Sequence, residues 1–139
     1  MQRPHLSAGS GSVQSPIGSP KELQEQLVLE LAVSNLERSL ALYTALGFTL
    51  ERRDGGFAAL MYDDRRLFLD ERKDLEPVPG PSRANVRIMV PDVDALWQRA
   101  QALGLAVEQP LADRYYGLRD FTVRDLDGHG LRFASTLPA

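Results

Sequence analysis

The stretch YYGLRDFTVRDLDGHGLRF, residues 115–133, decides how the rest of the chain is interpreted. On either side of an Asp-Leu-Asp-Gly segment, apolar and polar residues alternate with the period of half-buried strands. That segment suits a turn, because Asp125 can accept a hydrogen bond from the backbone two residues on, and Gly128 tolerates a positive φ. The stretch therefore predicts a β-hairpin with strands over 119–123 and 130–134.

Upstream, strand and helix patterns occur twice. In the first half the apolar periodicity predicts a strand, a helix that begins after Ser34-Asn35 and ends at Gly47, and three more strands. In the second half it predicts a strand, a helix from Pro91-Asp92 to Gly104, a further strand and then the hairpin. The predicted strands outside the hairpin are 27–33, 48–52, 57–62, 66–71, 84–90 and 105–108, and 109–118 is expected to be a loop.

The two halves align as an internal duplication. Asn35 falls on Asp92, Gly47 on Gly104, and Phe68 on Arg132. Each half is a βαβββ unit that cannot bury its sheet alone. We therefore predict an α+β fold in which two βαβββ modules form a curved, mixed eight-stranded sheet. The helices cover its convex face, and its concave face is left to bind a ligand.

The bulk composition limits the classes of function. The chain has 139 residues, 43% of them hydrophobic, a net charge of −3 and no cysteine. A weakly acidic chain does not predict a nucleic-acid or membrane partner. The lack of cysteine excludes disulfides and thiolate chemistry and fits the cytoplasm. We expect residues 1–22 to be a disordered extension, native or left from cloning, and 23–136 to be one domain with modules 27–72 and 83–136 and a linker 73–82.

The segment VSNLERSLALYTALGF, residues 33–48, resembles the first-module signature of the vicinal oxygen chelate superfamily, also called the glyoxalase/bleomycin resistance/dioxygenase fold. The stretch 115–133 is similar to its C-terminal signature and closest to the bleomycin resistance protein branch. Together the resemblance covers Leu27 to Ser135. It implies a ligand cleft at the interface of a homodimer.

The resemblance also implies where a metal would bind. Enzymes of the superfamily hold a divalent ion with donor side chains from four equivalent strand positions, which here carry Val28, Phe68, Asn85 and Arg132. Val and Phe have no donor atom, Asn offers one weak oxygen, and Arg is a fixed cation. We therefore expect no metal, no cofactor and no catalytic residue. His129 is expected to be an exposed turn residue.

Strand alternation then predicts which side chains face the cleft. The two adjacent tyrosines of the 109–118 loop are further candidates, since aromatic rings offer a flat binding surface. For Glu30 two roles stay open: an ion pair with Arg87 or Arg132, or direct ligand contact. The predicted binding residues are Glu30, Phe68, Asn85, Arg87, Tyr115, Tyr116, Thr122 and Arg132.

Three functions are consistent with this sequence. The first is a metal-free protein, similar to bleomycin resistance proteins, that sequesters a small molecule in a concave cleft between the chains of a homodimer. Its arginines would suit a carboxylate or phosphate. The second is a metal-dependent lyase, isomerase or dioxygenase, which the four positions disfavour. The third is a non-catalytic sensory or interaction domain with a closed cleft.

Overall fold

The computed structural model describes residues 27–139, so the extension predicted over residues 1–22 lies outside the described part. In chain order the elements are β1 (Leu29–Val33), α1 (Leu36–Ala45), β2 (Thr49–Asp54), β3 (Phe57–Tyr62), β4 (Arg65–Glu71), β5 (Asn85–Met89), α2 (Val93–Ala102), β6 (Val107–Asp113), β7 (Leu118–Arg124) and β8 (Gly130–Thr136). This order confirms two successive βαβββ modules.

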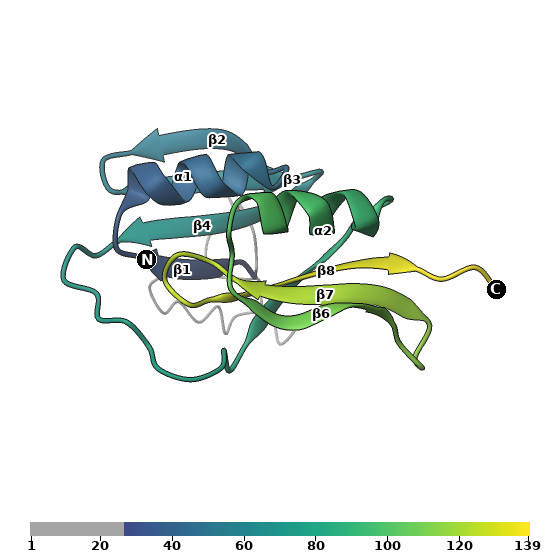
Figure 1. Ribbon diagram of the computed structural model, residues 1–139. Helices are drawn as coiled ribbons and strands as arrows, with labels where there is room; N and C mark the ends of the chain where they lie inside the picture. The colour runs from purple at the N-terminus through teal and green to yellow at the C-terminus, as the bar shows by residue number, and fades with distance from the viewer. Residues whose placement is uncertain (1–26) are drawn as a thin grey trace, which may run out of the picture.

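Each module forms its own mixed sheet of four strands. Sheet A has the order β1-β4-β3-β2 and sheet B the order β5-β8-β7-β6, with the first pair parallel and the others antiparallel. The eight strands of the predicted α+β fold thus form two backbone ladders, and side chains such as Leu29 and Val86 lie between their edges. Both helices lie on the same side of the strands (Figure 1).

The two helices begin and end in the same way. Asn35 caps α1 by accepting a hydrogen bond from the Arg38 amide at 3.0 Å, and Asp92 caps α2 by accepting one from Ala95 at 3.1 Å. Each helix is followed by a glycine with positive φ, as expected for a C-terminal stop. No helix within residues 27–139 is long and apolar enough to cross a membrane.

Strand register confirms the duplication residue by residue. In sheet A, Glu30 of β1 pairs with Phe68 of β4. In sheet B, Arg87 of β5 pairs with Arg132 of β8, which are the positions that the sequence alignment makes equivalent. The core lies between the sheets and the helices, where Trp97 of α2 packs edge-on against Phe121 at 5.1 Å. The face of each sheet away from its helix is therefore free to differ between modules.

The predicted hairpin is present as β7 and β8. The Asp127 amide donates to Oδ1 of Asp125 at 2.9 Å, and Gly128 has a φ of 93°. A Cβ at Gly128 would lie 2.8 Å from Nη2 of Arg124, the end of a flexible side chain that can move, so the positive φ is the reason that glycine suits this position.

His129 is not the exposed turn residue that we expected. Its side chain is partly buried, and Nε2 lies 2.7 Å from the Ala32 carbonyl oxygen. Beside it, the buried Tyr43 hydroxyl donates to Asp125 at 2.6 Å, and the Ser34 amide donates to Asp127 at 3.1 Å. The turn of the second module is therefore bound to the first module, a long-range contact that alternation within one hairpin does not reveal.

The prediction of a loop over 109–118 is also wrong in its first half, because β6 extends to Asp113 and only four residues connect it to β7. The extra residues of the second module favour a loop here, and Pro110 cannot donate to a strand ladder. However, β6 is an edge strand, and its pairing with β7 is irregular between Gln109 and Ala112. Proline is tolerated in that setting.

Candidate binding site

A hollow of about 420 Å³ opens on the face of sheet B that points away from α2. Strand alternation creates this face: Phe121 and Val123 point into the core, so Asp120 and Thr122 point into the hollow. The lining is almost entirely polar and aromatic. It consists of Asn85, Gln109, Arg114, Tyr115, Tyr116, Asp120, Thr122 and Arg132.

The carboxylate of Asp120 is the centre of the site. Asp120 is only 2% exposed, and both of its carboxylate oxygens accept hydrogen bonds. Oδ1 accepts from Nε of Arg114 at 2.8 Å, and Oδ2 accepts from Nη2 of Arg132 at 2.6 Å. A buried carboxylate is costly unless paired in this way, so the two arginines hold Asp120 ionised.

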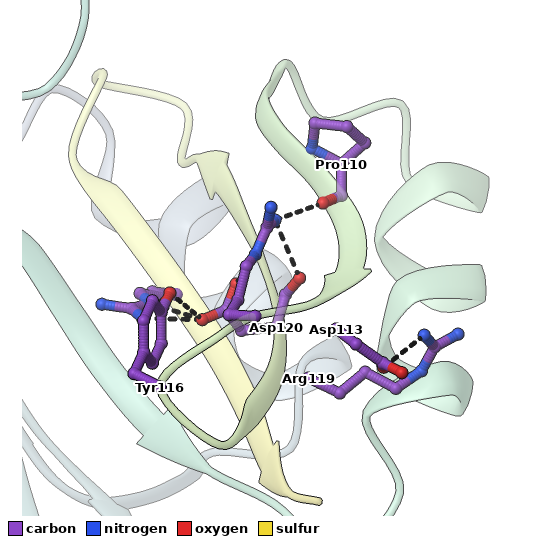
Figure 2. Close-up of polar contacts among 7 residues, drawn as sticks. Pro110, Asp113, Tyr116, Arg119 and Asp120 are labelled. Atoms are coloured by element: carbon purple, nitrogen blue, oxygen red, sulfur yellow. Dashed lines mark hydrogen bonds and ion pairs between the residues drawn. The ribbon is translucent and has the colours of Figure 1, made fainter.

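Tyr116 completes the cluster from the connection between β6 and β7. Its hydroxyl donates to Oδ2 of Asp120 at 2.9 Å and accepts from Nη2 of Arg132. The Arg132 guanidinium carbon lies 5.3 Å from the centre of its ring, and Tyr115 stands edge-on to it with centroids 5.1 Å apart. Figure 2 shows Tyr116 directed at Asp120. Arg132 therefore has a fixed position in the hollow.

The cluster also fixes the protonation of its members. Burial raises the pKa of Asp120, but hydrogen bonds from Arg114, Arg132 and Tyr116 outweigh it and leave the pKa below its ordinary value. The pKa of Tyr116 is raised, first by loss of water and then by its hydrogen bond to Asp120. The hydrogen bond to Asp120 likewise raises the pKa of Arg132. Neither Asp120 nor Tyr116 is thus a ready proton acceptor or donor near neutral pH.

Local backbone structure places Arg114 in the cluster. The Arg114 amide donates to the Leu118 carbonyl at 2.7 Å, which closes the connection, and Gly117 takes a φ of 92° within it. Nη2 of Arg114 also donates to the Pro110 carbonyl oxygen at 2.6 Å. The irregular edge strand that sequence analysis mistook for a loop thus supplies an anchor for a site residue.

A second ion pair nearby faces the other way. Arg119 precedes Asp120 in β7, so its side chain points to the helix side, where it binds Asp94 of α2 at 2.8 Å and Asp113 at 3.0 Å. Figure 2 shows Arg119 with Asp113, apart from the Asp120 cluster. Arg119 is therefore a matched control for the arginines of the hollow.

The structure brings five of the eight predicted binding residues together in one hollow: Asn85, Tyr115, Tyr116, Thr122 and Arg132. Arg87 is the register partner of Arg132 but lines a neighbouring cavity of about 320 Å³. Glu30 and Phe68 are register partners on sheet A and do not line the hollow. One chain thus does not assemble the whole predicted set.

Sequence analysis missed three lining residues, Gln109, Arg114 and Asp120. The ion pair considered between Glu30 and Arg132 is absent from residues 27–139, where the carboxylate bound to Arg132 is Asp120. A signal for Asp120 was present: it lies diagonally across the predicted hairpin from Arg132, and such pairs interact. Arg114 offered none, since it lies in the connection after β6, where strand alternation does not predict the direction of a side chain.

The four positions that the family resemblance assigns to a metal do not carry a set of metal ligands here. Phe68 has no donor, and Arg132 is a cation whose hydrogen bonds are directed to Asp120. Within residues 27–139 no three His, Asp or Glu side chains are grouped so that they could hold an ion. Of the four side chains, Asn85 and Arg132 are suited to binding polar and anionic groups, and Val28 and Phe68 offer apolar contact only.

The chain is similar in sequence and in fold to several known proteins. A family model described as the glyoxalase/bleomycin resistance protein/dioxygenase superfamily matches residues 26–133. A bleomycin resistance protein from Geobacillus stearothermophilus is 32% identical over 124 residues, covering 78% of this chain and 94% of that protein. The crystal structure of TioX from Micromonospora sp. ML1 is 30% identical with a TM-score of 0.66, covering 82% of this chain and all (100%) of TioX. A bleomycin resistance determinant encoded on the transposon Tn5 shares the fold, with a TM-score of 0.63 at 20% identity, covering 81% and 98% of the two chains.

Proposed function

Because the chain belongs to the glyoxalase/bleomycin resistance protein/dioxygenase superfamily, we propose that it is a metal-free member that binds a small organic molecule and releases it unchanged. The observation that carries the proposal is Arg132. It stands where metal-dependent members carry a ligand to the ion, and it is bound to the buried carboxylate of Asp120. The relative at 32% identity is called a bleomycin resistance protein, so bleomycin is the first compound to test.

The mechanism is sequestration by mass action. The exposed rings of Tyr115 and Tyr116 supply contact area, while Asn85 and Thr122 supply hydrogen-bonding groups that orient the ligand. The carboxylate and phenol of the cluster already bind each other and the arginines. The carboxylate and the phenol therefore supply neither a general base nor a nucleophile, and the site holds a ligand without changing it. If the ligand is toxic, binding lowers its free concentration and so protects the cellular component that it would otherwise attack. The cysteine-free sequence is our reason for proposing a cytoplasmic location.

We further propose that two chains together complete the cleft. The predicted binding residues divide between the sheets: the hollow is lined from sheet B, and Glu30 and Phe68 lie on sheet A. Sheet A of a second chain placed over the hollow would unite them and would enclose a ligand that one chain leaves open to water. It would also cover exposed edges of the sheets.

Native mass spectrometry of the purified protein tests the binding function. We expect a dimer of the 15.4 kDa chain that carries one organic molecule per cleft, recovered with unchanged mass, and no divalent ion. A stoichiometric divalent ion whose removal stops conversion of the bound compound would instead establish the metal-dependent enzyme. A dimer whose cleft accepts no compound, bleomycin included, would support the sensory or interaction domain.

Mixed dimers test whether the cleft is shared between chains. Phe68→Ala and Tyr116→Ala chains are each expected to bind N-phenylnaphthylamine, a neutral fluorescent probe, less well than the unaltered protein, because each loses an aromatic ring of the proposed cleft. If the cleft joins sheet A of one chain to sheet B of the other, a dimer of one chain of each kind has one unaltered cleft, and mixing restores binding. If each cleft lies within one chain, every cleft keeps one substitution and mixing restores nothing.

A further inference from the structure

We infer that the ligand of this hollow is an anion, with a carboxylate, sulfonate or phosphate group attached to an aromatic body. The inference rests on the proposed function and adds the chemical class of the ligand. It is drawn from an excess of positive charge, from unused hydrogen-bond donors and from exposed aromatic rings, all on one face of sheet B.

The charge of this face is opposite to that of the chain. Arg87 and Arg132 are register partners in adjacent parallel strands, so their side chains lie on the same face, and Arg114 reaches it from the connection between β6 and β7. Asp120 is the carboxylate of the hollow, which leaves an excess of one positive charge from Arg114 and Arg132, and Arg87 in the neighbouring cavity adds a second on the same face. The whole chain carries −3, so this local excess is not a consequence of composition. One arginine would have neutralised the buried carboxylate.

The guanidinium groups of Arg114 and Arg132 also have N–H donors that the cluster does not use. Arg114 uses Nε and Nη2, and Arg132 uses Nε and Nη2, for the bonds that hold the cluster together. Within residues 27–139 the Nη1 group of each has no hydrogen-bond partner, and neither atom is buried. Two fixed cations with free N–H groups in one hollow are suited to binding the oxygens of an anion.

Aromatic rings lie next to these donors. Tyr115 is 99% exposed and Tyr116 is 47% exposed, although both are large side chains. Arg132 lies over the Tyr116 ring, so a flat ligand that contacts this ring would bring its charged group near the guanidinium. An anion joined to an aromatic ring satisfies both features at once.

Three naphthalene derivatives of one shape and different charge test the inference: 2-naphthoate, its neutral amide 2-naphthamide, and the cation 2-naphthylmethylammonium. Binding to the full chain is measured by calorimetry, and the location of binding by shifts of the Tyr116, Asp120 and Thr122 amide signals in NMR spectra. We expect naphthoate to bind about tenfold or more tightly than naphthamide, the usual effect of a charged hydrogen bond. Salt should weaken binding of naphthoate only.

Substitutions assign the preference to the arginines. Arg132→Gln should lower the affinity for naphthoate about tenfold and change the affinity for naphthamide little. Arg87→Gln is the second variant, because Arg87 is exposed and takes part in no ion pair within residues 27–139, so the fold does not depend on it. We expect it to cost naphthoate about threefold. Arg119→Gln removes the same charge on the helix side and should leave all three affinities unchanged.

The outcomes separate this inference from the proposed function. If the three compounds bind equally, or if the preference for naphthoate persists in both Arg87→Gln and Arg132→Gln, the inference of an anionic ligand is wrong and the binding function stands. If none of the three shifts the hollow's amide signals, both are overturned. Preference for the cation would also overturn the inference.

Discussion

On the face of sheet A that points away from α1, Phe57 and Phe68 meet edge to face with ring centroids 5.0 Å apart. On sheet B the same register positions hold Asp120 and Arg132. Phe57 pairs with the residue two after Phe68, and Asp120 pairs with the residue two after Arg132. A contact between two rings in one module is thus an ion pair in the other.

This difference shows which parts of the duplicated unit can vary. The residues that alternate with these, such as Leu69 and Phe133, are fully buried in both modules and form the core with the helices. Folding requires apolar side chains on that face alone. The other face is free to carry chemistry, and the two modules use it differently. At these two positions sheet A offers apolar area, and sheet B offers charge and hydrogen bonds.

The largest expected effect comes from breaking the ion pair at its centre. Asp120→Asn leaves Arg114 and Arg132 close together without a counter-charge, and we expect the free energy of unfolding to fall by about 2–4 kcal/mol. Urea denaturation measures it. Asp113→Asn, which affects only the exposed pair with Arg119, should cost about 0.5 kcal/mol or less. Equal stability of the two variants would show that the cluster does not stabilise the fold.

Breaking the aromatic contact should have a smaller effect of a different kind. Phe68→Ala removes a half-buried ring and its contact with Phe57, with an expected loss of about 1–2 kcal/mol. The loss should be independent of salt, and in the proposed shared cleft it should weaken charged and neutral probes equally. Phe68→Leu, which keeps most of the apolar area, is the control. A selective loss of anion binding in Phe68→Ala would contradict the division of roles between the sheets.

The contribution of the phenol can be measured with a matched pair of tyrosines. Tyr116→Phe removes the hydroxyl that donates to Asp120, and since the residue is 47% exposed we expect a loss of about 0.5–1 kcal/mol. Tyr115→Phe removes a hydroxyl that is without a hydrogen bond within residues 27–139, so thermal unfolding should show no change. If both variants unfold alike, Tyr116 does not support the cluster.

The smallest expected effect is a pH dependence, because burial and hydrogen bonding act in opposite directions on Asp120. Its pKa is lower in the folded chain than in the unfolded chain. The stability from its ionised form is therefore complete above the ordinary pKa of about 4 and is lost as the pH falls through the lowered value. Melting temperatures between about pH 6 and pH 3 measure the loss. The Asp120→Asn variant should lack this part of it, whereas Phe68→Ala should retain it.

Sequence reasoning succeeded where local patterns determine structure. The helix caps Asn35 and Asp92, the Asp125 turn and the alternation that directs Arg132 away from the core all follow from rules that act over a few residues. The duplication then gave the correct register, and with it the contrast between Phe68 and Arg132.

It failed where tertiary contacts decide. Arg114 lies in the connection after β6, and it belongs to the site because its side chain bonds to Asp120 and to the Pro110 carbonyl oxygen of that irregular edge strand. His129 is partly buried because the turn binds a strand of the other module. The assignment of Asp120 as the partner of Arg132 required the pairing of two strands, not the pattern of one.

The bonds between the second module's turn and the first module have a consequence for how the chain folds. Tyr43 and Asp125 are 82 residues apart, Ser34 and Asp127 are 93 apart, and Ala32 and His129 are 97 apart. During synthesis the first module therefore emerges with these polar groups unpaired until their partners, 82 to 97 residues further along the chain, have been made. Contacts over such separations form slowly, so we expect the docking of this turn to be a late step on the folding pathway.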